Sequence, residues 1–239
     1  MGCFLNVLQE LQAHIRSLVP DLPLPEAEKQ RVLVGLCDPF TTEGPPNLLP
    51  KAPFQIVDSD ELLVDLGSKL KVCASPIVLD IETTAIEPEN GTIVSIGIGF
   101  AGDYFYIPLG HTDDGGKLLP NQFPLLAVVQ ALPLQSLKIV AHNGKFEYSW
   151  LKHHAGIELQ IFWDTLLAGK LLDFNQPADL ERMACRMLDA VEWSLSSEDM
   201  KSFAKVPLEK AANYNSADLI NTYKLFELQR KEFADEPSF

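Results

Sequence analysis

The sequence predicts an α/β domain in which helices flank a mixed β-sheet, preceded by a short N-terminal helical extension. Between residues 76 and 108, three apolar, strand-like runs follow one another with short turns, as in an antiparallel meander. Segments with helical periodicity then alternate with a further strand, which is typical of a sheet covered by helices. Hydrophobic residues make up 46% of the chain, enough to bury a sizeable core in one domain.

The N-terminal 50 residues follow a different pattern from the rest. Apolar residues recur at helical spacing over 4–18, prolines break that pattern, and a second helix is expected over 26–36. A stretch at 38–53 contains Gly and Pro and is typical of a linker. We therefore expect a helical extension with a Pro-rich linker over 1–50 and the main domain over 51–239.

Within the main domain, capping and turn residues bound the expected elements. Asp58 or Ser59 caps the first helix, and Gly102-Asp103 forms the turn between the second and third strands. The expected strands cover 76–82, 92–100, 104–108 and 138–142. The expected helices cover 60–72, 121–132, 145–154, 164–173, 178–188 and 208–232.

Charge and cysteine content argue against several classes of protein. The net charge of −14 opposes a broad basic surface for nucleic acid, although metal ions bound by carboxylates reverse the local sign. The four cysteines form no CxxC pair, which disfavours a zinc site or a disulfide framework. No apolar run approaches the roughly 18 residues of a membrane helix, and the start lacks the basic residues of a signal peptide. We expect no membrane association and a reducing compartment, the cytoplasm or an organelle.

Two acids stand at the end of the first strand. Asp80 and Glu82 are separated by one residue, so on a strand both face the same side. Two carboxylates there are costly unless they are neutralised, and a divalent cation with oxygen ligands does so directly. Two solvated acids at the end of a strand give the same pattern, so this pair alone leaves both interpretations open.

Two later segments add polar side chains. Tyr214 and Asp218 are four residues apart and share one face of the expected helix. Glu147 stands in the first turn of the helix that follows Ala141-His142-Asn143-Gly144. An acid at that position either stabilises the helix dipole or serves as another metal ligand.

In this order and at these separations, the three segments resemble the three exonuclease motifs of family A DNA polymerases. They are of the DEDDy type, named for four acids and a tyrosine, and the resemblance spans about 54–229. Residues 162–167 (FWDTLL) also resemble the segment that these domains carry between the second and third motifs. The resemblance implies an RNase H-like fold with a five-stranded mixed sheet. It also implies a 3′→5′ exonuclease that releases nucleoside 5′-monophosphates from single-stranded or frayed DNA.

The roles of the family transfer onto the matching positions. The resemblance implies that Asp80, Glu82, Glu147 and Asp218 hold two divalent metal ions, Mg²⁺ or Mn²⁺. Asp80 would bridge both ions, Glu82 and Asp218 would complete the first site, and Tyr214 would orient the attacking water. The candidate contacts to the substrate strand are Thr83, Ile86 and Asn143 by the same resemblance, and Lys145 by its charge.

Glu147 departs from the family, which has Asp at this position. The extra methylene matters because a misplacement of about 1 Å in a catalytic site can cost about a hundredfold in rate. We expect an active enzyme that is slower than its relatives. Two alternatives stay open: an RNase D-like 3′→5′ exoribonuclease, and a catalytically weakened exonuclease fold that only binds.

The expected partners are a single-stranded DNA 3′ end and a separate DNA polymerase or other replication or repair protein. The chain would act alone or as part of a split or excised polymerase. Three other features are assigned to structure instead of chemistry. His111 is expected in a solvated loop, Trp150 and Trp163 in the core, and 194–198 in a loop.

Overall fold

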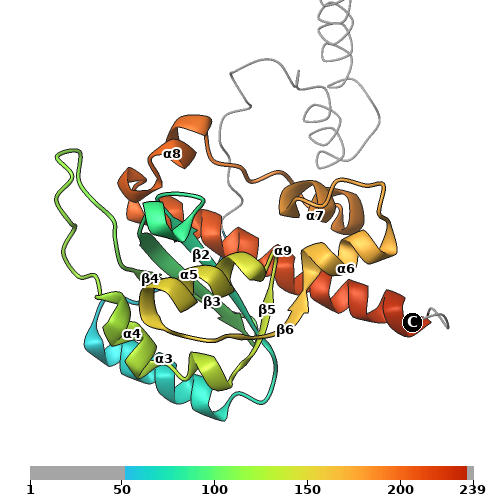
Figure 1. The fold of residues 1–239 in the computed structure, drawn as a ribbon, viewed down its shortest axis with the longest axis horizontal. Helices are drawn as coiled ribbons and strands as arrows, with labels where there is room; N and C mark the ends of the chain where they lie inside the picture. Colours follow the sequence, from blue (N-terminus) through green and yellow to red (C-terminus); the bar gives the residue numbers. More distant parts are fainter. Residues whose placement is uncertain (1–51, 236–239) are drawn as a thin grey trace, which may run out of the picture. The chain divides into compact units, whose positions relative to one another are not determined.

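The computed structural model describes residues 52–235, and the expected helical extension lies outside them. The described chain forms a mixed sheet of six strands in the order β1-β4-β3-β2-β5-β6 (Figure 1). β2, β3 and β4 form the expected antiparallel meander, whereas β5 runs parallel to β2 and β6 parallel to β5. The strands are β1 (Gln55–Ile56), β2 (Ile77–Thr83), β3 (Ile93–Phe100), β4 (Asp103–Pro108), β5 (Lys138–Ala141) and β6 (Gln160–Asp164).

Helices cover both faces of the sheet. α3, α4 and α5 pack on one face through the main apolar cluster, and α9 crosses the opposite face (Figure 1). The helices are α3 (Asp60–Val72), α4 (Leu125–Ala131), α5 (Lys145–Ala155), α6 (Thr165–Leu172), α7 (Leu180–Leu188), α8 (Ser197–Lys201) and α9 (Leu208–Asp235). Short 3₁₀ turns complete the chain at η2 (Pro88–Asn90), η3 (Leu134–Ser136) and η4 (Phe203–Lys205).

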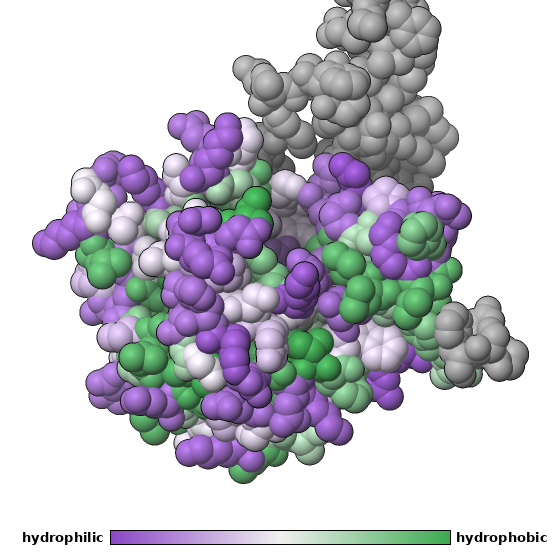
Figure 2. All heavy atoms as spheres, viewed as in Figure 1, coloured by the Kyte–Doolittle hydropathy of each residue, from purple (hydrophilic) through white to green (hydrophobic). Residues whose placement is uncertain are grey.

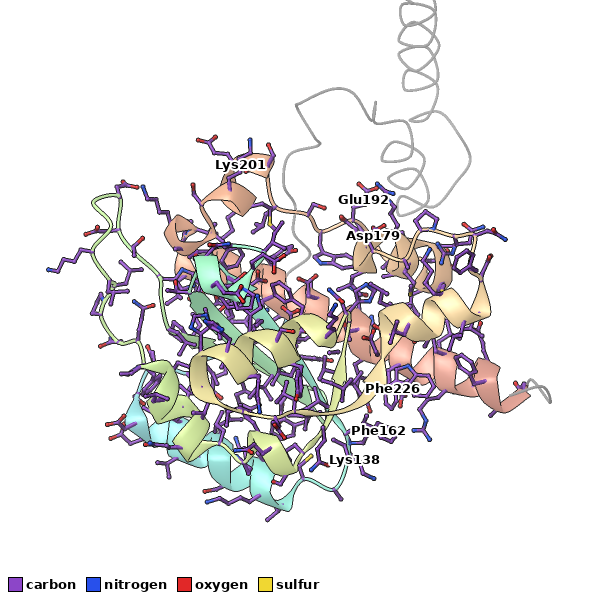
Figure 3. All side chains as sticks on the ribbon, viewed as in Figure 1. Lys138, Phe162, Asp179, Glu192, Lys201 and Phe226 are labelled. Atoms are coloured by element: carbon purple, nitrogen blue, oxygen red, sulfur yellow. The ribbon has the colours of Figure 1, made fainter. Side chains whose placement is uncertain are left out.

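The predicted mixed α/β architecture is confirmed, with one strand more than the five expected. β1 is only two residues long and pairs with β4 at the edge of the sheet, so it is too short to give a periodic signal. β6 was not among the expected strands either. It pairs in parallel with β5, and its Phe162 ring lies 5.3 Å from Lys138 Nζ and packs against Phe226 of α9 (Figure 3).

Local signals explain most helix boundaries. Ser59 is the N-cap of α3, and its side chain accepts the Leu62 N–H. The helix expected over 121–132 is shorter, because it begins only after Pro124, and a proline disfavours helical backbone in the residue before it. None of the helices within 52–235 is both long and apolar enough to cross a lipid bilayer.

Alternation along β2 decides which residues face α9. Ile77, Leu79 and Ile81 belong to the main cluster beneath α3, α4 and α5, whereas Val78 packs with Leu219 of α9. The even-numbered residues of β2 therefore point toward α9. Apolar side chains also gather outside the core over α6 (Figure 2), where the exposed residues are Leu167, Leu171 and Phe174.

Candidate active site

Three acids from two elements converge at one point of the sheet. Asp80 and Glu82 occupy even-numbered positions of β2 and face α9. Asp218 reaches the same point from α9. Each of the three acids offers an oxygen atom, and these atoms lie within 4.8 Å of one another. The structure thus brings together three of the four acids that the sequence suggested as metal ligands.

Asn215 lies between two of these acids and was not among the predicted site residues. Its side-chain Nδ2 donates to Asp80 Oδ2 at 2.6 Å and to Glu82 Oε1 at 3.4 Å. The side chain is fully buried, because α9 lies directly on β3 at Gly97. A Cβ atom at Gly97 would stand only 1.9 Å from Asn215 Oδ1. A glycine inside a strand was the sequence signal for such a close approach.

Tyr214 places its hydroxyl group at the Asp218 carboxylate, one helical turn away on α9. The two side chains form a hydrogen bond, and the tyrosine ring packs against Phe203 with centroids 6.2 Å apart. The negative charge of Asp218 raises the pKa of the Tyr214 phenol, and burial and the charges of Glu82 and Asp80 add to this rise. The phenol therefore keeps its proton at neutral pH, so it donates a hydrogen bond and does not act as a base.

Glu147 reaches the site from α5, the third element to contribute an acid. Its side chain is 2% exposed, and its Oε2 has no hydrogen-bond partner among the described residues. Burial, and next the charge of Asp80, raise the pKa of Glu147 well above its ordinary value. Glu147 is not a member of the group within 4.8 Å that the other three acids form. It therefore faces the same acidic region but stands apart from the close cluster.

Burial and mutual repulsion disfavour the ionised forms of the clustered acids. Burial raises the pKa of Asp80 to about 7, against an opposing hydrogen bond from Asn215. Burial also raises the pKa values of Glu82 and Asp218, and the charge of Asp80 adds to both shifts. A divalent cation favours the charged carboxylates and so reverses this effect. The donors are all carboxylate oxygens, which suit Mg²⁺ or Mn²⁺ better than zinc, so the residues present fit the expected ions.

Comparison with known proteins decides the family. Residues 54–233 match the 3′-5′ exonuclease family of family A DNA polymerases. The chain belongs to this exonuclease family. It is 32% identical over 237 residues to DNA polymerase I of Chloroflexus aurantiacus, covering 95% of this chain and 24% of that protein. It is 25% identical over 213 residues to DNA polymerase I of Borreliella burgdorferi, covering 87% of this chain and 22% of that protein. The chain thus spans about a quarter of the length of these curated relatives.

Solved structures with the same fold come from other nucleases. NrnC of Brucella melitensis is 22% identical, with a TM-score of 0.54 over 75% of this chain and 80% of that chain. RNase D of Escherichia coli, an exoribonuclease, is 18% identical, with a TM-score of 0.54 over 74% of this chain and 45% of that chain. At these identities the likeness shows the fold alone, and it confirms the expected RNase H-like arrangement.

Two candidate substrate contacts of this exonuclease domain follow the acids at the end of β2. The register of β2 is irregular between Glu82 and Thr83, a feature that often redirects side chains beside active sites. The Thr83 hydroxyl donates to the Ala85 carbonyl at 2.7 Å, whereas Ile86 is 80% exposed. The Trp150 indole N–H donates to the Ile86 carbonyl at 3.3 Å. This bond fixes the loop while the apolar Ile86 side chain faces solvent.

The other two candidate contacts, Asn143 in the loop before α5 and Lys145 at the first position of α5, are both exposed. The backbone N–H groups of Asn143 and Gly144 donate to the Asp164 carboxylate at 3.1 and 2.9 Å. Asp164 also accepts two backbone N–H groups from the first turn of α6 as its N-cap. Asp164 therefore positions the loop and is not available as a metal ligand. Sequence reasoning missed this role, although an acid just before a helix is an N-cap signal.

A small cavity of about 130 Å³ opens beside the end of β2. It separates the residues after Glu82 from the α8–η4 segment, and lysine side chains supply positive charge along it. Lys201 stands on α8 at the rim of the molecule (Figure 3). The lining residues are Thr83, Thr84, Thr112, Met200, Lys201, Ser202, Phe203, Ala204 and Lys205.

The expectation of a solvated His111 is wrong. His111 is fully buried, its Nε2 lies 2.6 Å from the Tyr106 hydroxyl, and its ring packs near Phe203. The loop folds back because the Thr112 N–H donates to the Ala204 carbonyl at 2.7 Å. Burial lowers the pKa of His111, so it is a neutral core residue beneath η4.

Trp193 is another site residue that the sequence did not reveal. It follows α7, is 3% exposed, and donates its indole N–H to Asp218 Oδ1 at 2.7 Å. The other two tryptophans were expected in the core. Trp150 is fully buried as predicted, whereas Trp163 is half-buried and donates to Gln229 Oε1 at 3.0 Å.

Proposed function

We propose that this exonuclease domain hydrolyses the terminal phosphodiester at the 3′ end of single-stranded or frayed DNA and releases nucleoside 5′-monophosphates. One observation carries the proposal. Acids from β2, α5 and α9 face one point of the sheet, and a tyrosine hydroxyl is hydrogen-bonded to one of them. Such a set of oxygen donors matches metal-assisted phosphodiester hydrolysis.

The geometry supports an assignment of ligands to two divalent ions. Asp80, Glu82 and Asp218 would share one ion, because their oxygens already lie within 4.8 Å of one another. Asp80 and Glu147 would share the second, since Glu147 has a buried oxygen without a partner among the described residues. When bound, such ions lower the pKa of a water molecule and stabilise charge on the leaving oxygen.

The other side chains would organise the reacting groups. Tyr214 keeps its proton and, through its bond to Asp218, is fixed where it can orient a water molecule by hydrogen bonding. Asn215 holds the Asp80 and Glu82 carboxylates in place. Ile86 exposes an apolar side chain that can pack between bases, and Asn143 and Lys145 offer polar contacts to the strand.

DNA is the proposed substrate because the curated relatives are DNA polymerases, one of them 32% identical. For the same reason we propose that the domain works with a polymerase, either on the same chain or as a separate partner. The unpaired 3′ end would be favoured because a terminal base must leave its stack to reach the acids. We also propose that Glu147 supports catalysis at a reduced rate, since its carboxylate faces the site but stands outside the close cluster.

The test is cleavage of a 5′-labelled single-stranded DNA oligonucleotide in Mg²⁺, Mn²⁺ or EDTA. The expected result is a ladder that shortens from the 3′ end and disappears in EDTA and in the Asp80→Ala variant. Asp58→Ala removes an exposed acid before α3 and is the matched control, which should keep full activity. An RNA oligonucleotide of the same sequence serves as a second substrate. Faster shortening of RNA would favour an RNase D-like enzyme, and intact oligonucleotides in both metals would favour a binding module.

A further inference from the structure

Trp193 contacts the acidic site from a segment outside the three motif regions. It lies between α7 and α8, in the apolar cluster that joins α7 to α9. Its indole N–H donates to Asp218 Oδ1 at 2.7 Å, and the ring is 3% exposed. The indole nitrogen is a donor only. It therefore stabilises the Asp218 carboxylate in its ionised, metal-binding form.

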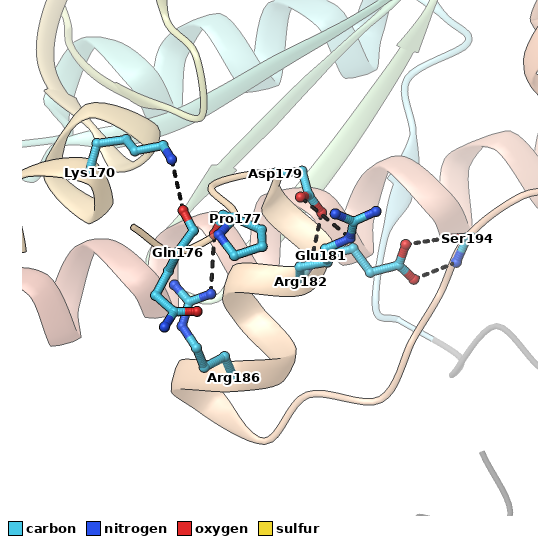
Figure 4. A network of polar contacts seen from close by, with 8 residues as sticks. All are labelled: Lys170, Gln176, Pro177, Asp179, Glu181, Arg182, Arg186 and Ser194. Atoms are coloured by element: carbon cyan, nitrogen blue, oxygen red, sulfur yellow. Dashed lines mark hydrogen bonds and ion pairs between the residues drawn. The ribbon is translucent and has the colours of Figure 1, made fainter. Parts of the chain in front are cut away.

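The backbone at Trp193 is anchored to α7. The Glu181 carboxylate accepts the Trp193 N–H at 2.9 Å and the Ser194 N–H at 3.2 Å. It also accepts the Ser194 hydroxyl (Figure 4). Two consecutive backbone N–H groups are therefore bound to one side chain, Glu181. The sequence predicted only a loop over 194–198. Because the backbone is held by Glu181 and the ring by packing, the indole N–H has a defined position.

Asp218 depends on this contact more than its neighbours do. Asn215 holds Asp80 and Glu82, whereas the bonds to Asp218 come from Trp193 and Tyr214. A carboxylate on a helix can rotate about two side-chain torsions, and a charge-assisted hydrogen bond limits that rotation. An apolar residue would fill the same space but would not restrain the Asp218 carboxylate. The indole N–H group therefore has a role beyond packing.

We propose that Trp193 is a positioning residue for the metal site: its indole N–H holds the Asp218 carboxylate where an oxygen meets those of Asp80 and Glu82. Glu181 holds Trp193 in place. This inference rests on the proposed metal-dependent function. Outer-shell partners of metal ligands typically change metal affinity by about 10–100-fold. The effect of Trp193 should therefore appear first in metal affinity.

The test compares Trp193→Phe with Trp163→Phe. Each variant keeps an aromatic ring and loses one indole hydrogen bond near α9, but the Trp163 partner is Gln229, far along the helix from Asp218. Mn²⁺ binding is measured by titration calorimetry, with the melting temperature as a check on folding. We expect Mn²⁺ affinity about 10–100-fold lower in W193F and within about twofold of wild type in W163F.

Tryptophan fluorescence supplies a second readout. Mg²⁺ should change the emission of the wild type and of W163F, and W193F should lose this change. If W193F does not fold, Glu181→Gln provides the same test, because it weakens the anchor and leaves the ring. E181Q should lower Mn²⁺ affinity by a smaller factor in the same direction.

Two results would overturn the positioning role. One is a folded W193F, or E181Q in its place, with wild-type Mn²⁺ affinity. The other is equal weakening in W193F and W163F, because general loosening of α9 would then explain both. The readout is metal binding, so it separates this inference from the proposed nuclease activity. Wild-type protein that binds Mn²⁺ but cleaves nothing would end the proposed nuclease function and leave the positioning role of Trp193 standing.

Discussion

The substitution Gly97→Ala is expected to disable the acidic site from a strand that contributes no acid. A Cβ atom at position 97 would stand 1.9 Å from Asn215 Oδ1 and 2.8 Å from its Cγ. Ordinary carbon contacts begin near 3.5 Å, so the amide must move by roughly 1.5 Å. Asn215 is fully buried and α9 lies directly on β3, so this movement must be taken up by the amide or by the helix.

The magnitude follows from the contacts that move. Overpacking costs about 1–3 kcal/mol, and losing the 2.6 Å hydrogen bond from Asn215 to Asp80 costs about 1.5–3 kcal/mol. We therefore expect the free energy of unfolding to fall by about 3–5 kcal/mol. Cleavage should slow by about a hundredfold or more, because Asp80 and Glu82 lose the group that holds them.

The assay combines urea unfolding in EDTA with cleavage rates in Mn²⁺, for Gly97→Ala, Asn215→Ala and the double variant. Asn215→Ala removes the clash, so the double variant should be about as stable as Asn215→Ala alone. Gly99→Ala is the control on the same face of β3. Its Cβ would meet the Tyr104 ring at 2.8 Å and no acid, so stability should fall while cleavage stays within a few-fold.

Two outcomes would refute this reasoning. A loss of less than about 1 kcal/mol in Gly97→Ala would mean that the amide is not held against β3. Simple additivity in the double variant would mean that Gly97 and Asn215 do not act through one contact.

Three further predictions concern charge. In EDTA, the free energy of unfolding should fall as pH rises from about 4 to about 7, by at most roughly 1.4 kcal/mol per pH unit for each buried acid of the site. Burial raises the pKa of Asp80 from 3.8 to about 7, so the folded state favours its protonated form; Mg²⁺ should abolish the fall, and a flat profile in EDTA would contradict it. The double substitution Lys201→Gln, Lys205→Gln should raise KM for long DNA, with little change for a dinucleotide. The slope of the logarithm of DNA affinity against the logarithm of salt concentration should become shallower by about 1–2. Lys71→Gln, on the exposed face of α3, should change neither. Asp164→Ala should lower the free energy of unfolding by about 2–4 kcal/mol in urea, because backbone N–H groups of the loop before α5 and of the first turn of α6 lose their acceptor. A change near zero would show that the carboxylate does not clamp the loop.

Local sequence patterns predicted much of this protein. Apolar runs and turn residues predicted the meander from β2 to β4, and helical periodicity predicted the long helix α9. The one-residue separation of Asp80 and Glu82 put both carboxylates on one face of a strand. The four-residue separation of Tyr214 and Asp218 put both on one face of a helix. These are short-range relations, and backbone geometry fixes them wherever the elements lie.

Tertiary structure decided which groups support these acids. Asn215 and Asp80 are hydrogen-bonded although they lie 135 positions apart in the sequence, and Trp193 and Asp218 although they lie 25 apart. No periodicity links such residues, because their contact depends on how closely α9 approaches β3 and on where α7 ends. Gly97 determines how closely α9 approaches β3, since only a residue without a side chain leaves room for the Asn215 amide.

The same distinction applies to residues whose identity was clear but whose setting was not. The sequence showed a histidine in a polar loop, and only the fold buried His111 against Tyr106. It also showed Glu147 at the position of the fourth acid. Only the packing of α5 decided that this carboxylate faces the site, buried, and outside the group formed by the other three. Sequence determined which chemical groups are present and which face each takes locally, whereas distances between elements depend on packing that no local pattern encodes.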